Sequence, residues 1–192
     1  AYLMTGLLEE GSGDMDAQAF AAAQEALAAS FGFDVYDDTV TISVRFLTEN
    51  RAESLALLKT VLTQPRFDPE AIERVRTQVL SILASDAQDP DSVAGATWSQ
   101  LAFGQHAYGT PREGTAASVA ALTREDIIAA HQRLFTRDTL SVSAVGDISA
   151  AELGPMLDDL LGQLPAGEGL KTAAVDFATE GGLTVVDMPT PQ

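Results

Sequence analysis

Two adjacent carboxylates, Glu9 and Glu10, are the residues near the start of the chain best suited to acid–base chemistry. We expect them to lie on a short helix that spans residues 2–10 and ends at Gly11. Neighbouring residues on a helix point about 100° apart, so these carboxylates cannot face each other across a scissile bond, as hydrolysis by a carboxylate pair requires. Unaided hydrolysis by this pair is therefore disfavoured.

The residues Gly6-Leu7-Leu8-Glu9-Glu10 also have the spacing of an H-x-x-E-H zinc motif. In that motif, two histidines four residues apart bind zinc, and the glutamate before the second histidine polarises the attacking water. Here Gly6 and Glu10 stand at the two histidine positions, and Glu9 stands at the general-base position. With no imidazole beside it, Glu9 has no zinc-bound water to activate.

Four longer stretches give the chain a resemblance to a known family. In their order along the chain they resemble the pitrilysin or insulinase-type zinc peptidases, and most of all the small bacterial members related to the mitochondrial processing peptidase and the bc1 core subunits. The Tyr-Gly and Gly-Thr pairs of residues 108–115, followed by S-V-A-A-L-T-R-E-D-I, carry the most specific part of the resemblance. The stretches are GSGDMDAQAF (11–20), PRFDPEAIERVRTQVL (65–80), FGQHAYGTPREGTAASVAALTREDIIAAHQRLF (103–135) and TLSVSAVGDISAAEL (139–153).

The resemblance implies a third zinc-ligand position, which the family fills with a glutamate on the helix after an F-D-x-x-x-x-E-R sequence, here residues 67–74. In this chain that position falls at Ile82, to within a few residues. Ile82 continues an apolar stripe, so packing accounts for it, and its side chain cannot bind a metal. The ligand positions Gly6, Glu10 and Ile82 are thus degenerate. We expect no catalytic residue and no cofactor in this chain, and zinc in a partner subunit.

Neither histidine replaces the missing ligands. We interpret His106 as a hydrogen-bonding residue that shapes a loop rich in glycine and proline, because the family commonly has His or Asn before its Tyr-Gly pair. His131 lies one turn after Ile127 on a predicted core helix, so we interpret it as a packed or capping residue. The charged residues Arg74 and Arg76, together with nearby glutamates, are typical of a solvated helix face.

Composition excludes several classes of function. The net charge of -17 would repel nucleic acid and anionic membrane surfaces. With no cysteine, disulfides and thiolate chemistry are excluded, and no apolar run approaches the roughly 20 residues of a membrane-spanning helix. A hydrophobic content of 46% indicates a globular chain with a substantial core.

The periodicity predicts an α+β fold, in which helices cover one face of a mostly antiparallel sheet. The clearest strand is residues 39–46, where Val40, Ile42 and Val44 alternate with polar residues, and residues 33–36 are its expected neighbour across a turn at 37–38. Further strands are expected at 140–145 and 183–186. Helices are expected at about 16–30, 50–64, 68–88, 91–101, 123–135 and 149–164.

We expect residues 1–164 to form a single processing-peptidase-like unit that lacks its N-terminal strands. Residues 165–181 are then a flexible linker, and residues 182–192 are a strand and the start of a connection to a second unit. The chain is thus expected to be a fragment of a longer two-unit protein.

The function that the resemblance implies is that of a non-catalytic subunit or half of a zinc metallopeptidase. Such a chain would help to enclose peptide substrate, would pair with an active subunit as in a heterodimer or with a second unit of the same chain, and would not be an enzyme on its own. The alternatives are an active peptidase or hydrolase with substituted ligands, and a structural scaffold like a core subunit. Exported bacterial relatives favour the periplasm over the cytoplasm.

Overall fold

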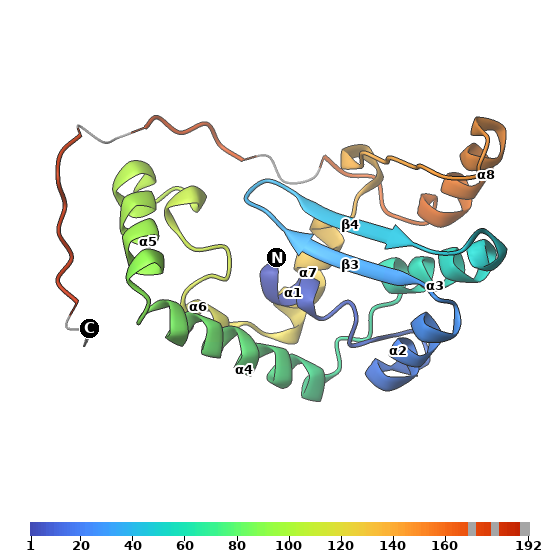
Figure 1. Ribbon diagram of the computed structural model, residues 1–192, viewed down its shortest axis with the longest axis horizontal. Helices are drawn as coiled ribbons and strands as arrows, with labels where there is room; N and C mark the ends of the chain where they lie inside the picture. Colours follow the sequence, from blue (N-terminus) through green and yellow to red (C-terminus); the bar gives the residue numbers. More distant parts are fainter. Residues whose placement is uncertain (169–171, 178–180, 189–192) are drawn as a thin grey trace.

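The computed structural model describes residues 1–168, 172–177 and 181–188 of the chain. Helices supply most of the regular structure in this part (Figure 1). Its α-helices are α1 (Tyr2–Gly6), α2 (Ala17–Ala26), α3 (Arg51–Thr63), α4 (Pro69–Asp86), α5 (Pro90–Phe103), α6 (Ala116–Ala121), α7 (Arg124–Leu134) and α8 (Ala150–Leu161). Its 3-10 turns are η1 (Thr48–Asn50), η2 (Ala107–Gly109) and η3 (Arg137–Thr139).

The strands of the described residues form two separate antiparallel hairpins. The small hairpin pairs β1 (Gly11–Ser12) with β2 (Met15–Asp16), and the larger pairs β3 (Ser30–Val35) with β4 (Val40–Arg45). Side chains along β4 alternate between half-buried and exposed, which confirms the predicted strand. The mixed class of helices and antiparallel strands is therefore as expected, although the paired strands here are few.

Capping boxes confirm the predicted starts of two helices. Thr123 and Asp126 satisfy each other's backbone N–H groups at the start of α7, and Ser149 and Glu152 do the same at the start of α8. These local signals need no tertiary partner, so the sequence pattern is sufficient to predict them.

Two other helix boundaries differ from the prediction because tertiary contacts or backbone conformation decide them. The side-chain amide of Asn50 donates to the carbonyl of Leu27 at 2.8 Å and makes no capping bond to α3. Helix α2 ends at Ala26, short of the expected residue 30, since Ala28 takes the left-handed conformation with φ 48°.

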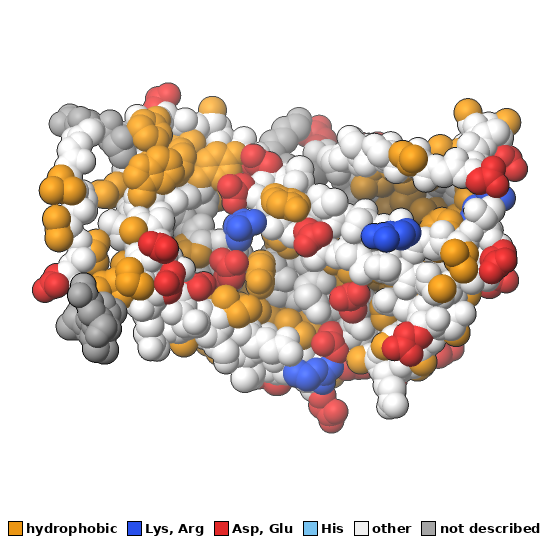
Figure 2. Space-filling view, in the orientation of Figure 1, with side chains coloured by type: hydrophobic (Ala, Val, Ile, Leu, Met, Phe, Trp, Pro, Cys, Tyr) orange, Lys and Arg blue, Asp and Glu red, His pale blue; other side chains and the backbone are white. Residues whose placement is uncertain are grey.

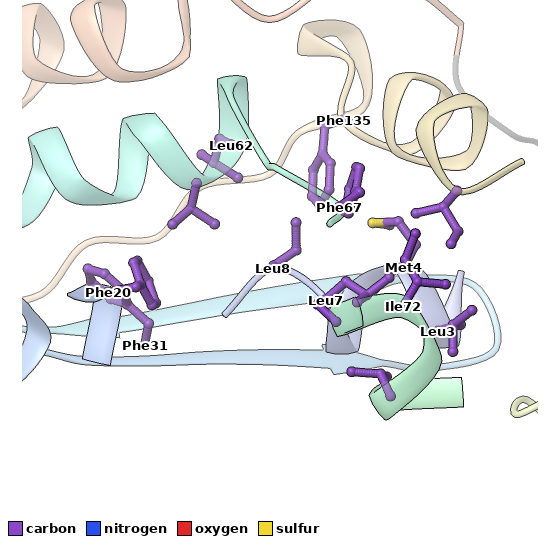
Figure 3. Close-up of a cluster of buried hydrophobic side chains, with 14 of the residues drawn as sticks. Leu3, Met4, Leu7, Leu8, Phe20, Phe31, Leu62, Phe67, Ile72 and Phe135 are labelled. Carbon is purple, nitrogen blue, oxygen red and sulfur yellow. The ribbon is translucent and has the colours of Figure 1, made fainter. Parts of the chain in front are cut away.

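The hydrophobic core forms where α1 and the turn after it meet α3, α4, α7 and the larger hairpin. Figure 3 shows Leu7 and Leu8 among side chains that come from distant parts of the chain. Full burial of a large apolar side chain stabilises the fold by about 1.5–3 kcal/mol, so packing holds the five-residue helix α1 in place. The buried members are Leu3, Met4, Leu7, Leu8, Phe20, Phe31, Leu57, Leu58, Val61, Leu62, Phe67, Ala71, Ile72, Val75, Val79, Val119, Ile127, Phe135, Leu160 and Leu164.

The expected strands at 140–145 and 183–186 are not formed in the part of the chain that the structure describes. Residues 140–147 are exposed and have no strand partner, and Val142 keeps 51% of its surface exposed. Leu183 is 89% exposed. Alternating apolar residues make a segment able to pair, but a ladder also needs a neighbouring strand edge.

The surface is acidic, as the net charge predicts. Figure 2 shows many acidic and few basic side chains on one face, with apolar side chains gathered over the end of the molecule that carries α5. Among the residues described, none of the helices combines the length and the hydrophobicity that crossing a membrane requires.

Candidate functional site

The residues at the zinc-motif spacing lie at the end of α1, which stops at Gly6 and does not extend to Glu10 as expected. The N–H of Leu7 donates to the carbonyl of Met4, and that of Glu10 donates to the carbonyl of Leu7, each at 3.1 Å. Bonds to the third preceding residue mark a tighter turn than an α-helix. Gly6 and Glu10 therefore do not share one face of a regular α-helix.

Gly6, at the first histidine position, lies against α4. A Cβ atom at Gly6 would be 3.3 Å from Cγ1 of Val75, which is closer than most contacts between such atoms. Any side chain at this position would require Val75 to shift by a few tenths of an ångström. The position offers no metal donor, and α4 limits the space beside it.

Glu10, at the second histidine position, forms an ion pair with Arg74 of α4. The Glu10 side chain is 21% exposed and that of Arg74 is 49% exposed. The guanidinium neutralises the carboxylate and joins the turn after α1 to α4. Glu10 is therefore engaged in a structural contact.

Arg76 has a different role from the solvated helix face that the sequence suggests. Its side chain is 11% exposed, and its guanidinium donates to the carbonyls of Val119 and Leu122 at the end of α6, the second at 2.8 Å. Glu73 pairs with its Nε at 3.2 Å. This arginine therefore joins α4 to α6.

Glu9, at the general-base position, is exposed overall, but its carboxyl is partly shielded from water. Desolvation by burial raises the pKa of Glu9, the charge of Glu10 raises it further, and a hydrogen bond with the Gln24 side chain partly opposes them. A raised pKa favours the neutral acid. By itself this gives Glu9 no metal-bound water and no facing carboxylate.

Ile82, at the third ligand position, is not explained by packing as expected, because it is 41% exposed. It follows Val75 by seven residues on α4, or about 10 Å along the helix axis. The α4 positions opposite Gly6 and Glu10 are instead Val75 and Arg74. The fold thus does not bring Gly6, Glu10 and Ile82 together at one point.

The residues at the expected ligand positions do not fit zinc. They offer one carboxylate, already paired with a guanidinium, and no imidazole, whereas zinc sites use three or four donors at about 2.0–2.3 Å. Across residues 1–168, 172–177 and 181–188, there is also no group of three or more His, Cys, Asp or Glu side chains placed to hold a metal ion.

His131 is a packed residue, as expected. Its ring lies 5.8 Å from the Phe67 ring and 4.9 Å from that of Phe135, between centroids. Burial lowers the pKa of His131, and a hydrogen bond to the backbone of Leu62 partly offsets this. Its Nε2 atom is buried and has no hydrogen-bond partner in the described residues, so the neutral ring is the form that the core accommodates.

His106 shapes a loop, as expected. Its Nδ1 accepts from the N–H of Tyr108 at 3.3 Å and caps η2, and its Nε2 lies 2.9 Å from the carbonyl of Ala173. The second contact reaches the segment after α8, which no local sequence pattern predicts.

A polar cluster that sequence reasoning missed forms around Asp38, in the turn of the larger hairpin. The Tyr108 hydroxyl donates to both carboxylate oxygens, at 2.9 and 2.7 Å, and the Thr172 hydroxyl donates at 2.6 Å. The hydrogen bond from Thr172 and then that from Tyr108 lower the pKa of Asp38, while the hydrogen bond to Asp38 raises the pKa of Tyr108. Its members are 134 residues apart at most, so only the fold unites them.

An open groove lies beside α5, next to the loop that carries the most specific sequence pattern. Its volume is about 320 Å³. No titratable side chain lines it, so it can contact a ligand but cannot transfer protons. The lining residues are Val93, Ala96, Thr97, Gln100, Gly109, Thr110, Pro111 and Thr115.

The structure is a helix-rich α+β domain that resembles a peptidase unit. Its residues at the zinc-motif positions make contacts within the domain. Residues 121–192 match the family described as the peptidase M16 inactive domain. Over 168 residues, the chain is 29% identical to the non-peptidase homolog YmxG of Helicobacter pylori, an alignment that covers 88% of this chain and 39% of that protein.

Solved structures agree with this relationship. A peptidase M16 inactive domain from Pseudomonas fluorescens superposes with a TM-score of 0.84 and 27% identity, over 88% of this chain and 42% of that one. Pitrilysin shares the fold, with a TM-score of 0.75 at 14% identity over 93% of this chain and 20% of its own. The chain is therefore similar to the pitrilysin-type, or M16, peptidases, and both the family model and the Pseudomonas structure that it matches are described as an M16 inactive domain. It spans about two fifths of the length of the first two relatives.

Proposed function

We propose that the chain is part of a non-catalytic half or subunit of a pitrilysin-type zinc metallopeptidase. It pairs with a zinc-bearing unit, either a separate subunit or another part of the same polypeptide, and forms part of the wall around the bound peptide. Zinc is held by the partner unit. The present chain belongs to a longer two-unit protein.

One observation carries this proposal: the residues at the zinc-motif positions make contacts within the chain. Gly6 lies against Val75, and Glu10 is paired with Arg74. In an active unit, these two positions carry histidines that bind zinc. The matches to an inactive domain and to a non-peptidase homologue support the same assignment.

A wall role is supported by the surface. The groove beside α5 has uncharged lining residues that suit contact with a peptide and do not suit its hydrolysis. The net charge of -17 favours basic or mixed peptides over acidic ones. A panel of peptides of equal length and graded charge, bound to the assembled protein, tests this preference; equal affinity across the panel contradicts it.

Metal analysis tests the proposed function. We would measure the zinc content of the chelator-free full-length protein, first alone and then co-expressed with a neighbouring peptidase-like chain. We expect no zinc bound within residues 1–192, and one zinc per assembled pair, removed by substituting the partner's motif histidines. Stoichiometric zinc that is lost on Glu10→Gln would contradict the proposal, since it would make Glu10 a ligand.

A further inference from the structure

Four aromatic rings lie together at the surface beside α5. Phe103, the last residue of α5, is central: its ring centroid lies 5.9 Å from that of Trp98 and 5.5 Å from that of Tyr108. The Phe177 ring lies 6.1 Å from that of Phe103 and 5.9 Å from that of Trp98. These spacings and the mostly edge-on orientations are those at which aromatic rings attract one another. Trp98, Phe103 and Tyr108, which we call the aromatic shelf, thus hold a ring that comes from a distant part of the chain.

Hydrogen bonds hold the other end of the segment that carries the fourth ring. The hydroxyl of Thr172 donates to Asp38, in the turn of the larger hairpin, at 2.6 Å. His106 accepts a backbone N–H at its Nδ1 atom, so its proton lies on Nε2, which donates to the carbonyl of Ala173 at 2.9 Å. Residues 172–177 are therefore attached to the rest of the unit at both ends.

These contacts set the course of the chain after α8. In Figure 1, this part of the chain returns past η3, continues past the turn of the larger hairpin and then runs beside α5. Near η3, the carbonyl of Pro165 accepts from the N–H of Arg137 at 2.9 Å, and the N–H of Gly167 donates to Asp138 at 2.8 Å. A stretch rich in glycine and alanine has no preferred path of its own, so the attachment at residues 172–177 directs it toward α5.

We propose that the aromatic shelf, Asp38 and His106 form a clasp for residues 172–177 of the same chain. The closed clasp fixes the place where the polypeptide leaves this unit, at α5 instead of beside η3. Its occupant is the segment seated on it in the structure, which brings a hydroxyl to the carboxylate, a carbonyl to the imidazole N–H and a ring to the shelf. The proposal does not rest on the proposed function.

The clasp is built from surface contacts, so it can open while the core stays folded. Trp98 is 53% exposed and Phe177 is 57% exposed. Within α5, all of whose residues the structure describes, Ala102 alone is buried. Contacts with so little buried surface belong to the low-stability end of a fold and open locally. Opening releases residues 172–177 and moves the exit of the polypeptide back toward η3.

Limited proteolysis of the full-length protein tests the clasp. A protease of broad specificity cuts residues 172–177 when the clasp is open, so the cleavage rate follows the open fraction. We expect Trp98→Ala, which leaves the sequence of the segment unchanged, to raise this rate about 3–10-fold. Leu101→Ala is the matched control, because this side chain lies on the same helix, is 50% exposed and is not part of the shelf. A wild-type rate in Trp98→Ala, or equal increases in both variants, would overturn the proposal.

A distance measurement tests the closed state directly. Residues 1–192 contain no cysteine, so spin labels can be attached at Gly95→Cys and Asp176→Cys in a full-length protein from which any other cysteine is removed. Gly95 has no neighbouring atom within 4 Å of its Cβ position, and Asp176 is exposed, so neither label disturbs the clasp. We expect one narrow distribution of distances between the labels, which broadens when Trp98→Ala is added.

The same labels distinguish the occupants of the shelf. A broad distribution without Trp98→Ala would show that residues 172–177 are not held there, and it would overturn the clasp. A narrow distance that appears only in a mixture of two singly labelled proteins would show that the segment of a second copy fills the shelf. That result would overturn the assignment to the same chain.

Discussion

Arg74 of α4 forms an ion pair with Glu10, the residue at the second histidine position of a zinc-type motif. The contact gives a residue at an expected metal-ligand position a structural role. Arg74 thus has a different role from Arg76, which lies two residues further along α4. The guanidinium of Arg76 donates to carbonyls at the end of α6.

Arg74 and Arg76 should respond differently to the same substitution. Arg74→Lys should cost less than about 1 kcal/mol of unfolding free energy, because the pair is solvent-exposed and lysine keeps the charge. Arg76→Lys should cost about 1–3 kcal/mol, because one ammonium cannot replace the paired donors and leaves a half-buried carbonyl without a partner. Urea unfolding of both variants measures the difference, and equal costs would contradict the assigned roles.

Restoring a histidine at Gly6 should destabilise the protein. The new Cβ would be 3.3 Å from Val75, so we expect Gly6→His to lower the free energy of unfolding by about 1–3 kcal/mol, with partial recovery in Gly6→His combined with Val75→Ala. Gly95→Ala in α5 is the control, since no atom lies within 4 Å of its Cβ position, and it should be neutral or stabilising by about 0.4–1 kcal/mol. A fully stable Gly6→His variant would refute the close packing against α4.

Because of His131, the free energy of unfolding should decrease as pH is lowered below about 6.5. Burial lowers its pKa in the folded state, so the unfolded chain takes up a proton that the native core resists. The stability is thus fully present above the unfolded pKa and is lost as pH falls toward the folded one. We expect His131→Gln to flatten the pH dependence between pH 7 and 5 in urea unfolding; an identical slope in both proteins would refute this.

Tyr108→Phe should loosen the segment after α8. It removes the hydroxyl bonds to Asp38, so the pKa of Asp38 should rise toward its ordinary value, measurable by NMR titration. In the native protein, the lowered pKa keeps Asp38 ionised at neutral pH, so the contact is present. The contact is lost as pH falls through the pKa of Asp38 in the folded state. Limited proteolysis within residues 165–181 should become faster in the variant.

Tyr36→Phe is the matched control for that experiment. The Tyr36 hydroxyl has no hydrogen bond within residues 1–168, 172–177 and 181–188, and its side chain is 53% exposed. Its removal should leave the cleavage rate and the pKa of Asp38 unchanged. Equal acceleration in both variants would show that the Asp38 contact does not hold the segment.

Local patterns in the sequence predicted the elements that local energies decide. The capping pairs before α7 and α8 and the alternation along β4 each act within a few residues, and each is confirmed. The relationship to the pitrilysin-type peptidases was also visible from residue patterns, and the comparisons confirm it. The degenerate ligand positions follow from residue identity alone and stay a prediction.

Tertiary structure alone decided which residues meet. The contacts of Glu10 with Arg74, of Gly6 with Val75 and of Asp38 with Thr172 join positions 64 to 134 residues apart. Such contacts depend on how amphipathic elements pack together, and one-dimensional periodicity shows that an element has a buried face without showing what covers it. For the same reason, the pattern at residues 140–145 predicted a strand, while the described fold provides no partner edge to complete it.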